Sequence, residues 1–319
     1  RPIPSGGTLA VNIISLEEYL KSVISSEMSA TASPALLRAH AIVSRSWLLA
    51  MLARRGGKDL NRSVIPGNPD EIVAWYDRGE HTLFDVCADD HCQRYQGITR
   101  QTSPAVAEAV EATRGQVLVY DGRICDARFS KCCGGRTEEF GACWGDEDHP
   151  YLQPVADRPA DGGTDFCDTA DETIITQVLN SYDREHTDFY RWSVTLDAAA
   201  LPALLLRKTG IDFGPVRDLE PLQRGKSGRI TRLLVRGERR SVILSKELEI
   251  RLALSESCLR SSAFDVEHSA GGFRLSGRGW GHGVGMCQIG AAVMGARGYS
   301  HPDILGHYFH GASITQLYD

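Results

Sequence analysis

The stretch that decides the fold lies near the start of the chain. It reads LEEYLKSVISSEM from Leu16 to Met28 and, after a short loop, PALLRAHAIVSRSWLLAMLAR from Pro34 to Arg54. Apolar residues recur at three- and four-residue intervals in both segments, which is the spacing of a helix with one buried face. Ser15 and Ser33 stand at the positions of N-caps, and a proline at the first helical position follows Ser33. The stretch therefore predicts an αα-hairpin.

One carboxylate continues the apolar stripe of the first helix. Leu20 and Val23 are followed, at the same spacing, by Glu27. Burial disfavours the charged form of a carboxyl group, and the negative end of a helix dipole acts in the same direction. Glu27 is therefore a candidate general acid. The alternative is a structural glutamate that pairs with Arg38 or Arg45.

A second group of residues has the chemistry of a metal site. His81, Cys87, His91 and Cys92 lie close together in an irregular segment. Thiolates combined with imidazole suit zinc. Because adjacent residues rarely bind one ion together, the predicted ligands are His81, Cys87 and Cys92, with His91 beside the ligands or facing the substrate. A Cys87–Cys92 disulfide, or a pair of buried thiols, is the alternative.

Two further motifs lie in Gly-rich segments. Gly277–Gly285 alternates glycine with side chains before an expected helix, and it displays Trp280 and His282. The segment contains neither of the two glycine patterns that are typical of nucleotide-binding sites. Two interpretations stay open: a loop that wraps a groove, or a compact structural turn. Cys132–Glu138 reads CCGGRTE and is followed by Trp144. A cysteine nucleophile there would need a distant histidine as its base, which leaves a Cys/His hydrolase open.

Composition is that of a globular protein. The 319 residues are 42% hydrophobic and 24% charged, and the net charge of −6 argues against binding nucleic acid through bulk positive charge. Uncharged apolar stretches such as Ser46–Ala53 are too short to cross a bilayer, so no transmembrane segment is expected. The nine cysteines include no C-x-x-C pair, which argues against zinc ribbons and thioredoxin-like sites.

Taken together, the motifs resemble one family, the SpoIID/LytB-domain proteins, named for stage II sporulation protein D. Leu16–Met28 is similar to the family pattern LEEYV..VV..EMP, and Leu37–Ser46 is similar to LKAQAVAARTY. Gly281–Ala291 is similar to GHGVGMSQ.GA. Further matches are His91–Gln93 with Tyr95 and Gly97, and Gly134–Glu138 with Trp144. The chain departs from the pattern where Ser29, His40 and Cys287 replace the usual Pro, Gln and Ser, which puts fine substrate contacts in doubt rather than the reaction.

The resemblance implies a peptidoglycan lytic transglycosylase. Such enzymes cleave the bond between N-acetylmuramic acid and N-acetylglucosamine, preferably in strands freed of stem peptides, and leave a 1,6-anhydro-muramic end. Glu27 corresponds to the family's catalytic glutamate, and some members bind zinc through one His and two Cys. Arg38 and Arg45 could meet the lactyl carboxylate, or could instead pair with Glu17. The residues expected to contact substrate are Arg38, Arg45, Tyr95, Arg136, Trp144, Trp280, His282 and Gln288.

The expected fold is α+β, with a mostly antiparallel β core, the hairpin that carries Glu27, and a second α+β lobe. Residues 1–160 would form the SpoIID-like core, 161–272 the second lobe, and 273–319 the Gly-rich loop and helices that return to the cleft. Further helices are expected at Pro104–Ala112, Asp171–Asn180, Lys246–Leu254 and Cys287–Gly295. Strands are expected at Thr8–Ser15, Gly115–Tyr120, Arg123–Ser130, Arg191–Leu196, Ile230–Arg236, Val242–Leu244 and Phe273–Leu275.

The expected location is the cell envelope. The chain begins with Arg1 rather than Met, so we expect that a signal peptide or lipoprotein anchor has been removed. The expected partners are glycan strands and an amidase that strips stem peptides. Two other functions stay open: a non-catalytic glycan-binding module or amidase enhancer, and zinc-dependent amide hydrolysis of stem peptides.

Overall fold

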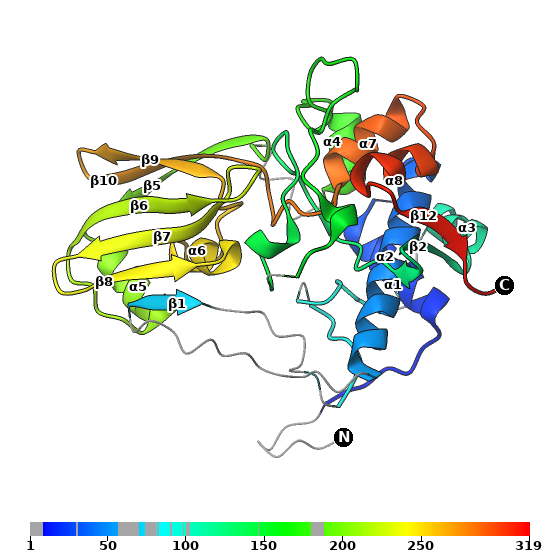
Figure 1. Ribbon diagram of the computed structural model, residues 1–319, viewed down its shortest axis with the longest axis horizontal. Coiled ribbons are helices and arrows are strands. Elements are labelled where there is room, and N and C mark those ends of the chain that lie inside the picture. Colours follow the sequence, from blue (N-terminus) through cyan, green and yellow to red (C-terminus); the bar gives the residue numbers. More distant parts are fainter. Residues whose placement is uncertain are drawn as a thin grey trace.

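Two hydrophobic cores organise the chain, and Figure 1 shows them as two lobes side by side. The computed structural model describes residues 9–29, 31–56, 70–73, 81, 83–89, 91–97, 99, 103–145, 147–179 and 188–319. The first core, here called the helical lobe, takes buried residues from Tyr19 to Phe189 and again from Val284 to Phe309. The second, here called the sheet lobe, takes them from Trp192 to Leu275.

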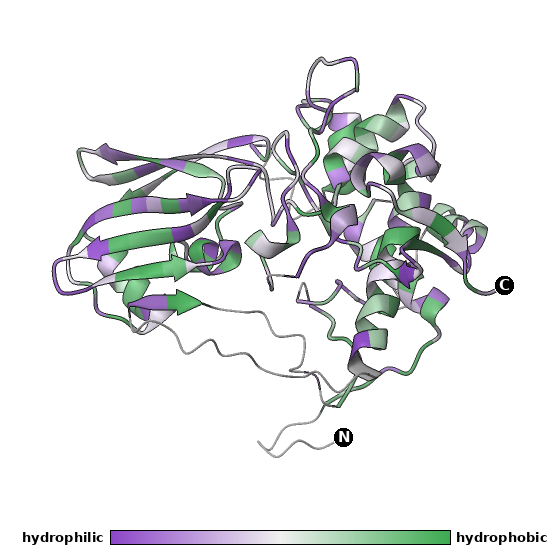
Figure 2. Cartoon of the chain, in the orientation of Figure 1, coloured by the Kyte–Doolittle hydropathy of each residue, from purple (hydrophilic) through white to green (hydrophobic). Residues whose placement is uncertain are grey.

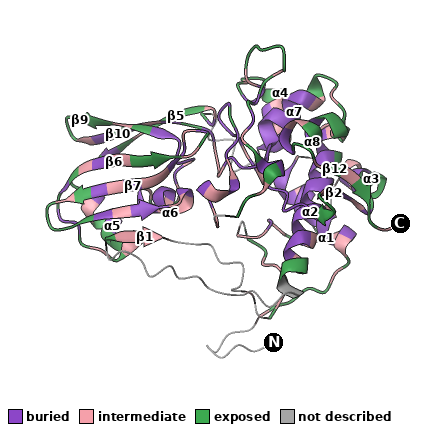
Figure 3. Ribbon diagram, in the orientation of Figure 1, coloured by how far each residue is buried: buried purple, intermediate pink, exposed green. Residues whose placement is uncertain are grey.

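The helices expected near the start of the chain are present. Helix α1 spans Leu16–Glu27 and helix α2 spans Pro34–Gly56. Leu20, Val23 and Ile24 of α1 are fully buried, as their spacing predicts. The segment Pro34–Arg54 is long and apolar enough to cross a membrane by length and composition, but 78% of its most apolar window is buried, which fits a core helix. Figure 3 shows this burial along α1 and α2.

Short elements complete the helical lobe. Its other helices are α3 (Pro104–Ala112), α4 (Glu172–Val178), α7 (Gln288–Ala296) and α8 (His301–Tyr308), with 3₁₀ turns at Phe140–Ala142 and Pro150–Leu152. Strands β12 (Ser313–Gln316), β2 (Gln116–Tyr120) and β3 (Arg123–Ile124) form one antiparallel sheet in that order. Strands β4 (Phe129–Ser130) and β11 (Met286–Cys287) pair in parallel. The strand expected at Thr8–Ser15 is not formed, because residues 9–15 have no regular structure.

The sheet lobe holds the larger sheets. Its four-stranded sheet has the order β1 (Glu71–Val73), β8 (Ser241–Ser245), β7 (Ile230–Gly237) and β6 (Val216–Arg224). Its three-stranded sheet has the order β5 (Arg191–Asp197), β10 (Gly272–Arg278) and β9 (Phe264–Ser269), and helices α5 (Leu201–Thr209) and α6 (Glu247–Ala253) accompany the sheets. Burial alternates along β10, and Figure 2 shows hydrophobic and hydrophilic residues following one another along these strands.

The fold is α+β with several antiparallel sheets, as predicted, but the β structure is distributed differently. The strands around α2 are short, and the larger sheets surround the second core. Phe166, Ile175 and Val178 pack in the helical lobe, whereas β1 comes from early in the chain and pairs with β8. The division into 1–160, 161–272 and 273–319 stays a prediction.

Buried charges connect the two lobes. Arg229, fully buried before β7, donates to the carbonyl oxygens of Cys133 (3.3 Å) and Gly281 (3.1 Å). The carboxylate of Glu138, also fully buried, accepts from the backbone N–H groups of Lys226 (2.9 Å) and Ser227 (3.0 Å). These charge-assisted hydrogen bonds fix the turn between β6 and β7 against the helical lobe.

Candidate functional site

A pocket of about 450 Å³ brings together side chains from distant parts of the chain. They come from the end of α1, from α2, α6 and the start of α7, from the segments 91–94, 127–131 and 143–144, from Cys258, and from the loop 280–282. Its lining residues include Glu27, Trp47, His91, Cys92, Gln93, Arg94, Arg128, Lys131, Trp144, Glu247, Arg251, Trp280, His282 and Gln288. Six of the predicted site residues are therefore gathered here: Glu27, Cys92, Trp144, Trp280, His282 and Gln288.

Glu27 is held at the C-terminus of α1. It is the last helical residue, because the backbone of Met28 is extended and its N–H bonds to Ile24 (2.8 Å). The side chain of Glu27 lines the pocket although the residue is only 8% exposed. Burial, together with the nearby Cys92, Cys87 and Glu27, raises the pKa of Tyr19. Glu27 lines the same pocket as His91 and Cys92 of the His/Cys group.

Aromatic and cationic side chains form one wall. The ring of Trp144 packs edge-on against His282, with centroids 4.8 Å apart. The guanidinium carbon of Arg128 lies 3.9 Å from the Trp144 ring centroid, which is a cation–π contact. The carboxylate of Asp126 forms a salt bridge with Arg128 (2.8 Å). Asp126 and Trp144 together therefore orient the Arg128 side chain. Trp280 lines the pocket from the Gly-rich loop, where its backbone pairs with that of Cys132.

Two histidines at the pocket are held neutral. Burial, followed by the charges of Arg229 and Arg251, lowers the pKa of His282 to about 3. Its Nδ1 accepts from the N–H of Val284 (3.0 Å), so the proton of the neutral ring lies on Nε2. His282 is therefore an uncharged side chain of the pocket wall, and a hydrogen bond to the backbone of Phe129 opposes part of the lowering of its pKa.

His40 supports Gln288 from behind. Burial and the charge of Lys131 lower the pKa of His40 to about 3. The amide nitrogen of Gln288 lies 3.1 Å from His40 Nε2, and His40 Nδ1 lies 3.1 Å from the hydroxyl of Ser44. Because an amide nitrogen only donates, His40 accepts from Gln288 and donates toward Ser44. This chain fixes the orientation of Gln288 at the pocket wall.

The second carboxylate of the pocket is already neutralised. Glu247 and Arg251 lie four residues apart on α6, and the guanidinium Nη1 is 3.2 Å from the carboxylate. Both residues are buried, so the pair is well shielded from solvent.

The predicted metal residues lie close together. The ligand atoms of His81, Cys87, His91 and Cys92 all lie within 4.8 Å of one another. The Cys92 sulfur lies 3.3 Å from His81 Nε2 and 3.6 Å from His91 Nδ1. His91, predicted to lie beside the ligands or to face the substrate, is thus close enough to be a fourth ligand. Two nitrogens and two sulfurs could hold a metal ion, and His91 and Cys92 also line the pocket.

Arg45 pairs with Glu17, which is the structural alternative that the sequence left open. It is fully buried, and its guanidinium donates to both carboxylate oxygens of Glu17, at 3.0 and 2.6 Å. A third bond runs to the carbonyl oxygen of Gln116 (3.0 Å). Its position in this network, and not in the pocket lining, explains why an arginine stands in the middle of a core helix.

Three other predicted contact residues also lie outside the pocket lining. Arg38 is exposed near His301, whose pKa is lowered by burial and by the charge of Arg38. Tyr95 stacks on Tyr19 with ring centroids 5.5 Å apart. Arg136 is exposed, and its backbone pairs with Ala156.

Several pocket residues were not predicted. These are Trp47, Gln93, Arg94, Arg128, Lys131 and Arg251. Arg128 and Lys131 lie in or next to the strand expected at Arg123–Ser130, where alternation indicates burial but not which face meets a cavity. Gln93 and Arg94 directly follow the His91-Cys92 pair, which is the signal that could have included them.

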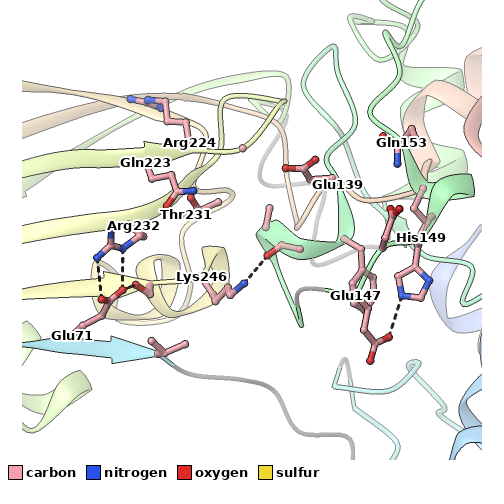
Figure 4. A pocket seen from close by; sticks show the side chains of 18 residues that line it. Glu71, Glu139, Glu147, His149, Gln153, Gln223, Arg224, Thr231, Arg232 and Lys246 are labelled. Carbon is pink, nitrogen blue, oxygen red and sulfur yellow. Dashed lines mark hydrogen bonds and ion pairs between the residues drawn. The ribbon is translucent and has the colours of Figure 1, made fainter. Parts of the chain in front are cut away.

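A larger pocket of about 570 Å³ lies between the lobes, and Figure 4 shows its charged side chains. Glu71 pairs with Arg232 through two bonds of 3.0 Å, and Lys246 donates to the carbonyl oxygen of Gly141 (2.6 Å). Its lining contains no residue of the predicted site among the described parts of the chain. We therefore place the candidate site in the smaller pocket.

Comparisons with known proteins agree with the motifs. A model of the family "Stage II sporulation protein" (SpoIID) matches residues 4–120, and a model of a domain of unknown function matches residues 138–285. The stage II sporulation protein D of Bacillus amyloliquefaciens is 24% identical over 315 residues, which cover 99% of this chain and 78% of the relative. The same protein of Bacillus subtilis is 23% identical over 316 residues, with the same two coverages.

A relative with a different name is also similar. The amidase enhancer of Bacillus subtilis is 26% identical over 322 residues, which cover 93% of this chain but 40% of that protein. The family model covers both helices at the start of the chain, and the sporulation relatives match nearly all of it. Residues 4–120 therefore match the SpoIID family, and the similarity to the two sporulation proteins extends over nearly all of the chain.

Proposed function

We propose that this protein is a peptidoglycan lytic transglycosylase with Glu27 as its general acid and base. The observation that carries the proposal is a buried carboxyl group in a pocket with three tryptophans, Trp47, Trp144 and Trp280. Flat aromatic rings are suited to contact the apolar faces of sugar rings. The names of the relatives, a sporulation protein and an amidase enhancer, support a role at the cell wall.

The reaction needs one carboxyl group because the substrate supplies the nucleophile. An ordinary glycosidase uses two carboxyl groups, one as acid and one as base or nucleophile. In the proposed reaction Glu27 gives its proton to the glycosidic oxygen as the C1–O bond breaks. The C6 hydroxyl of the same muramic acid attacks C1 and returns its proton to Glu27. The other carboxylate of the pocket, Glu247, is held by Arg251, which agrees with a single acid–base residue.

The charge of the pocket suits muramic acid. That sugar carries a lactyl carboxylate, unless a stem peptide is attached to it. Arg94 and Lys131 line the pocket and supply positive charge, in the role first expected of Arg38 and Arg45. A free lactyl carboxylate forms an ion pair with these groups, whereas the amide that joins a stem peptide is uncharged, so we propose a preference for peptide-stripped strands.

Zinc in the His/Cys group would have a structural role. Two imidazole nitrogens and two thiolates are a ligand set that zinc prefers, and four protein ligands leave no open position. Bound zinc would fix the segment 81–92, and with it His91 and Cys92 at the pocket wall. No step of the proposed reaction involves this group.

A glycan-binding amidase enhancer is the second candidate function. Similarity to the Bacillus subtilis amidase enhancer over 93% of this chain favours it. In that case the protein would bind strands without cutting them and would require a partner amidase in the cell envelope.

A product assay separates the candidates. The protein would be incubated with purified peptidoglycan, with and without prior amidase treatment, and the products read by mass spectrometry. The proposal predicts 1,6-anhydro-muramic ends, more abundant after amidase treatment. Unchanged strands that are retained in a pull-down would favour the binding module, and free stem peptides would favour amide hydrolysis.

A further inference from the structure

Four side chains that the proposed function does not use meet inside the helical lobe. They are Cys133, Asp157, Cys167 and Cys287, and none is more than 2% exposed. Their sulfur and oxygen atoms all lie within 4.8 Å of one another. They come from the end of β4, from two places in the segment between the 3₁₀ turn at Pro150–Leu152 and α4, and from the start of α7. Three thiols and one carboxyl group, buried together, form a set of metal-ligand type.

The sulfur spacing fits a shared ion. The sulfur atoms of Cys133 and Cys167 lie 3.7 Å apart. A disulfide would require about 2.05 Å. Tetrahedral zinc with bonds to sulfur of about 2.3 Å places two sulfur ligands about 3.8 Å apart. The observed separation is therefore that of two ligands of one tetrahedral ion.

Hydrogen bonds already orient the ligands. The carboxylate of Asp157 accepts from the hydroxyl of Tyr308 (2.6 Å) and from the N–H of Cys167 (3.1 Å). The sulfur of Cys287 accepts from the N–H groups of Cys133 (3.2 Å) and Gly290 (3.4 Å) at the first turn of α7. Backbone donors at a helix N-terminus favour the thiolate, which is the form that binds metal. Such outer hydrogen bonds are the usual support of metal ligands.

We propose that Cys133, Asp157, Cys167 and Cys287 bind one zinc ion in a closed, structural site. Thiolates select zinc over the hard cations magnesium and calcium. Four protein ligands leave no position for substrate, which distinguishes a structural from a catalytic site. Lys131 of the pocket lies two residues before the ligand Cys133, and Gln288 directly follows the ligand Cys287. The ion therefore fixes this part of the pocket lining. The proposal is independent of the proposed reaction.

The zinc content of the purified protein tests the site. The amounts of zinc per chain would be compared between the wild type and the Cys167→Ser variant by elemental mass spectrometry. Cys167→Ser is expected to lose one zinc per chain, whether or not the His/Cys group is loaded. Cys125→Ser is the matched control, because Cys125 is also fully buried but outside both groups, and it should keep all the zinc. Equal zinc in Cys167→Ser and the wild type would overturn the proposal.

A second measurement avoids changing the buried site. The double variant Cys87→Ser/Cys92→Ser removes both thiols of the half-buried group, so any tightly bound zinc remains in the buried one. X-ray absorption at the zinc edge is expected to report three sulfur ligands and one oxygen. A variant that folds without zinc would contradict the proposal. So would a Cys133–Cys167 disulfide, detected in the wild type by alkylation under denaturing, non-reducing conditions.

Discussion

Arg45 and Glu17 form a buried ion pair between α2 and α1. Arg45 is fully buried and Glu17 is 6% exposed, and two hydrogen bonds join them. Burial opposes ionisation of Glu17, but the hydrogen bonds from Arg45 and from the hydroxyl of Tyr318 hold its pKa below the usual value. The charge of each partner is thus tolerated in the core only because the other is present.

Removing one partner of this pair should be costly. Arg45→Leu is expected to lower the free energy of unfolding by about 3–5 kcal/mol, because it leaves the Glu17 carboxylate buried without its partner. Urea unfolding would measure the loss, and the double variant Glu17→Leu/Arg45→Leu should recover much of it. A stable Arg45→Leu variant with weakened substrate binding would instead indicate that Arg45 binds substrate.

The buried His40 predicts a dependence of stability on pH. Its pKa is about 3 in the folded protein and about 6.5 in an unfolded chain, so the unfolded state binds more protons between these values. The contribution of His40 to stability is therefore complete above pH 6.5 and declines as the pH falls toward 3. His40→Gln should make urea midpoints fall less steeply in this window, whereas the exposed His268→Gln should not. Parallel curves for the wild type and His40→Gln would contradict this explanation.

The Gly-rich loop is the element that brings β11 against β4. The N–H of Met286 bonds to the carbonyl oxygen of Arg128 (2.9 Å), and the residue before it, Gly285, has a φ of +73°. A Cβ atom on Gly285 would lie 2.2 Å from that same carbonyl oxygen. Only glycine allows both the backbone conformation and the close approach. The loop thus sets the position of Arg128 at the pocket.

Gly285→Ala should disturb both stability and activity. The methyl group would force β4 and β11 apart, so we expect a loss well above the roughly 1–2 kcal/mol that positive φ alone costs a non-glycine residue. Gly298→Ala is the control, because Gly298 also has a positive φ (+87°) but no atom within 4 Å of a Cβ. Thermal unfolding of the two variants measures the difference. Equal losses would mean that the contact with Arg128 is unimportant.

Elements with strong local signals were predictable. The helix expected at Pro104–Ala112 has those bounds, because its proline and preceding serine fix the start. By contrast, α5, α8, β6, β9 and β12 were not predicted. Strand β12 at Ser313–Gln316 is mostly exposed, so it lacks the apolar alternation of a buried strand and forms by pairing with β2. The formation of β12 depends on tertiary contacts, which the local sequence pattern does not reveal.

In the whole molecule, the side chain of Glu138 makes the main hydrogen-bonded contact between the two lobes. It lies in the helical lobe, and its carboxylate accepts three hydrogen bonds from Lys226 and Ser227 of the sheet lobe. Buried N–H groups that lose a charged acceptor keep their full desolvation cost. Glu138 and Arg229, together with the bond from Lys246 to Gly141, therefore hold the lobes in position.

Glu138→Ala should uncouple the lobes. We expect the free energy of unfolding to fall by about 2–4 kcal/mol and the transition to lose cooperativity, since several buried donors lose their acceptor. Differential scanning calorimetry would reveal two transitions or one broadened transition. Glu220→Ala removes an exposed carboxylate that pairs with Arg236 and should leave one sharp transition. An unchanged, sharp transition in Glu138→Ala would contradict the proposed coupling.

The composition of the two candidate sites was predictable only in part. Glu27, the tryptophans and the His/Cys group stood out by motif and spacing. The buried cysteine site was not predicted, because its ligands come from four places in the chain and no spacing rule joins them. Likewise, Arg45 and Glu27 both interrupt apolar helix faces, and only the packing of distant segments places one in a salt bridge and the other in a pocket.

The role of Glu27 as acid and base can be tested by counting reaction products. Peptide-stripped glycan strands would be digested with the wild type, with Glu27→Gln, and with Glu18→Gln, which changes a more exposed carboxylate of the same helix. Mass spectrometry would count the 1,6-anhydro-muramic ends. We predict that these ends form with the wild type and Glu18→Gln and are absent with a fully folded Glu27→Gln. Anhydro ends formed by Glu27→Gln at the wild-type rate would contradict the account.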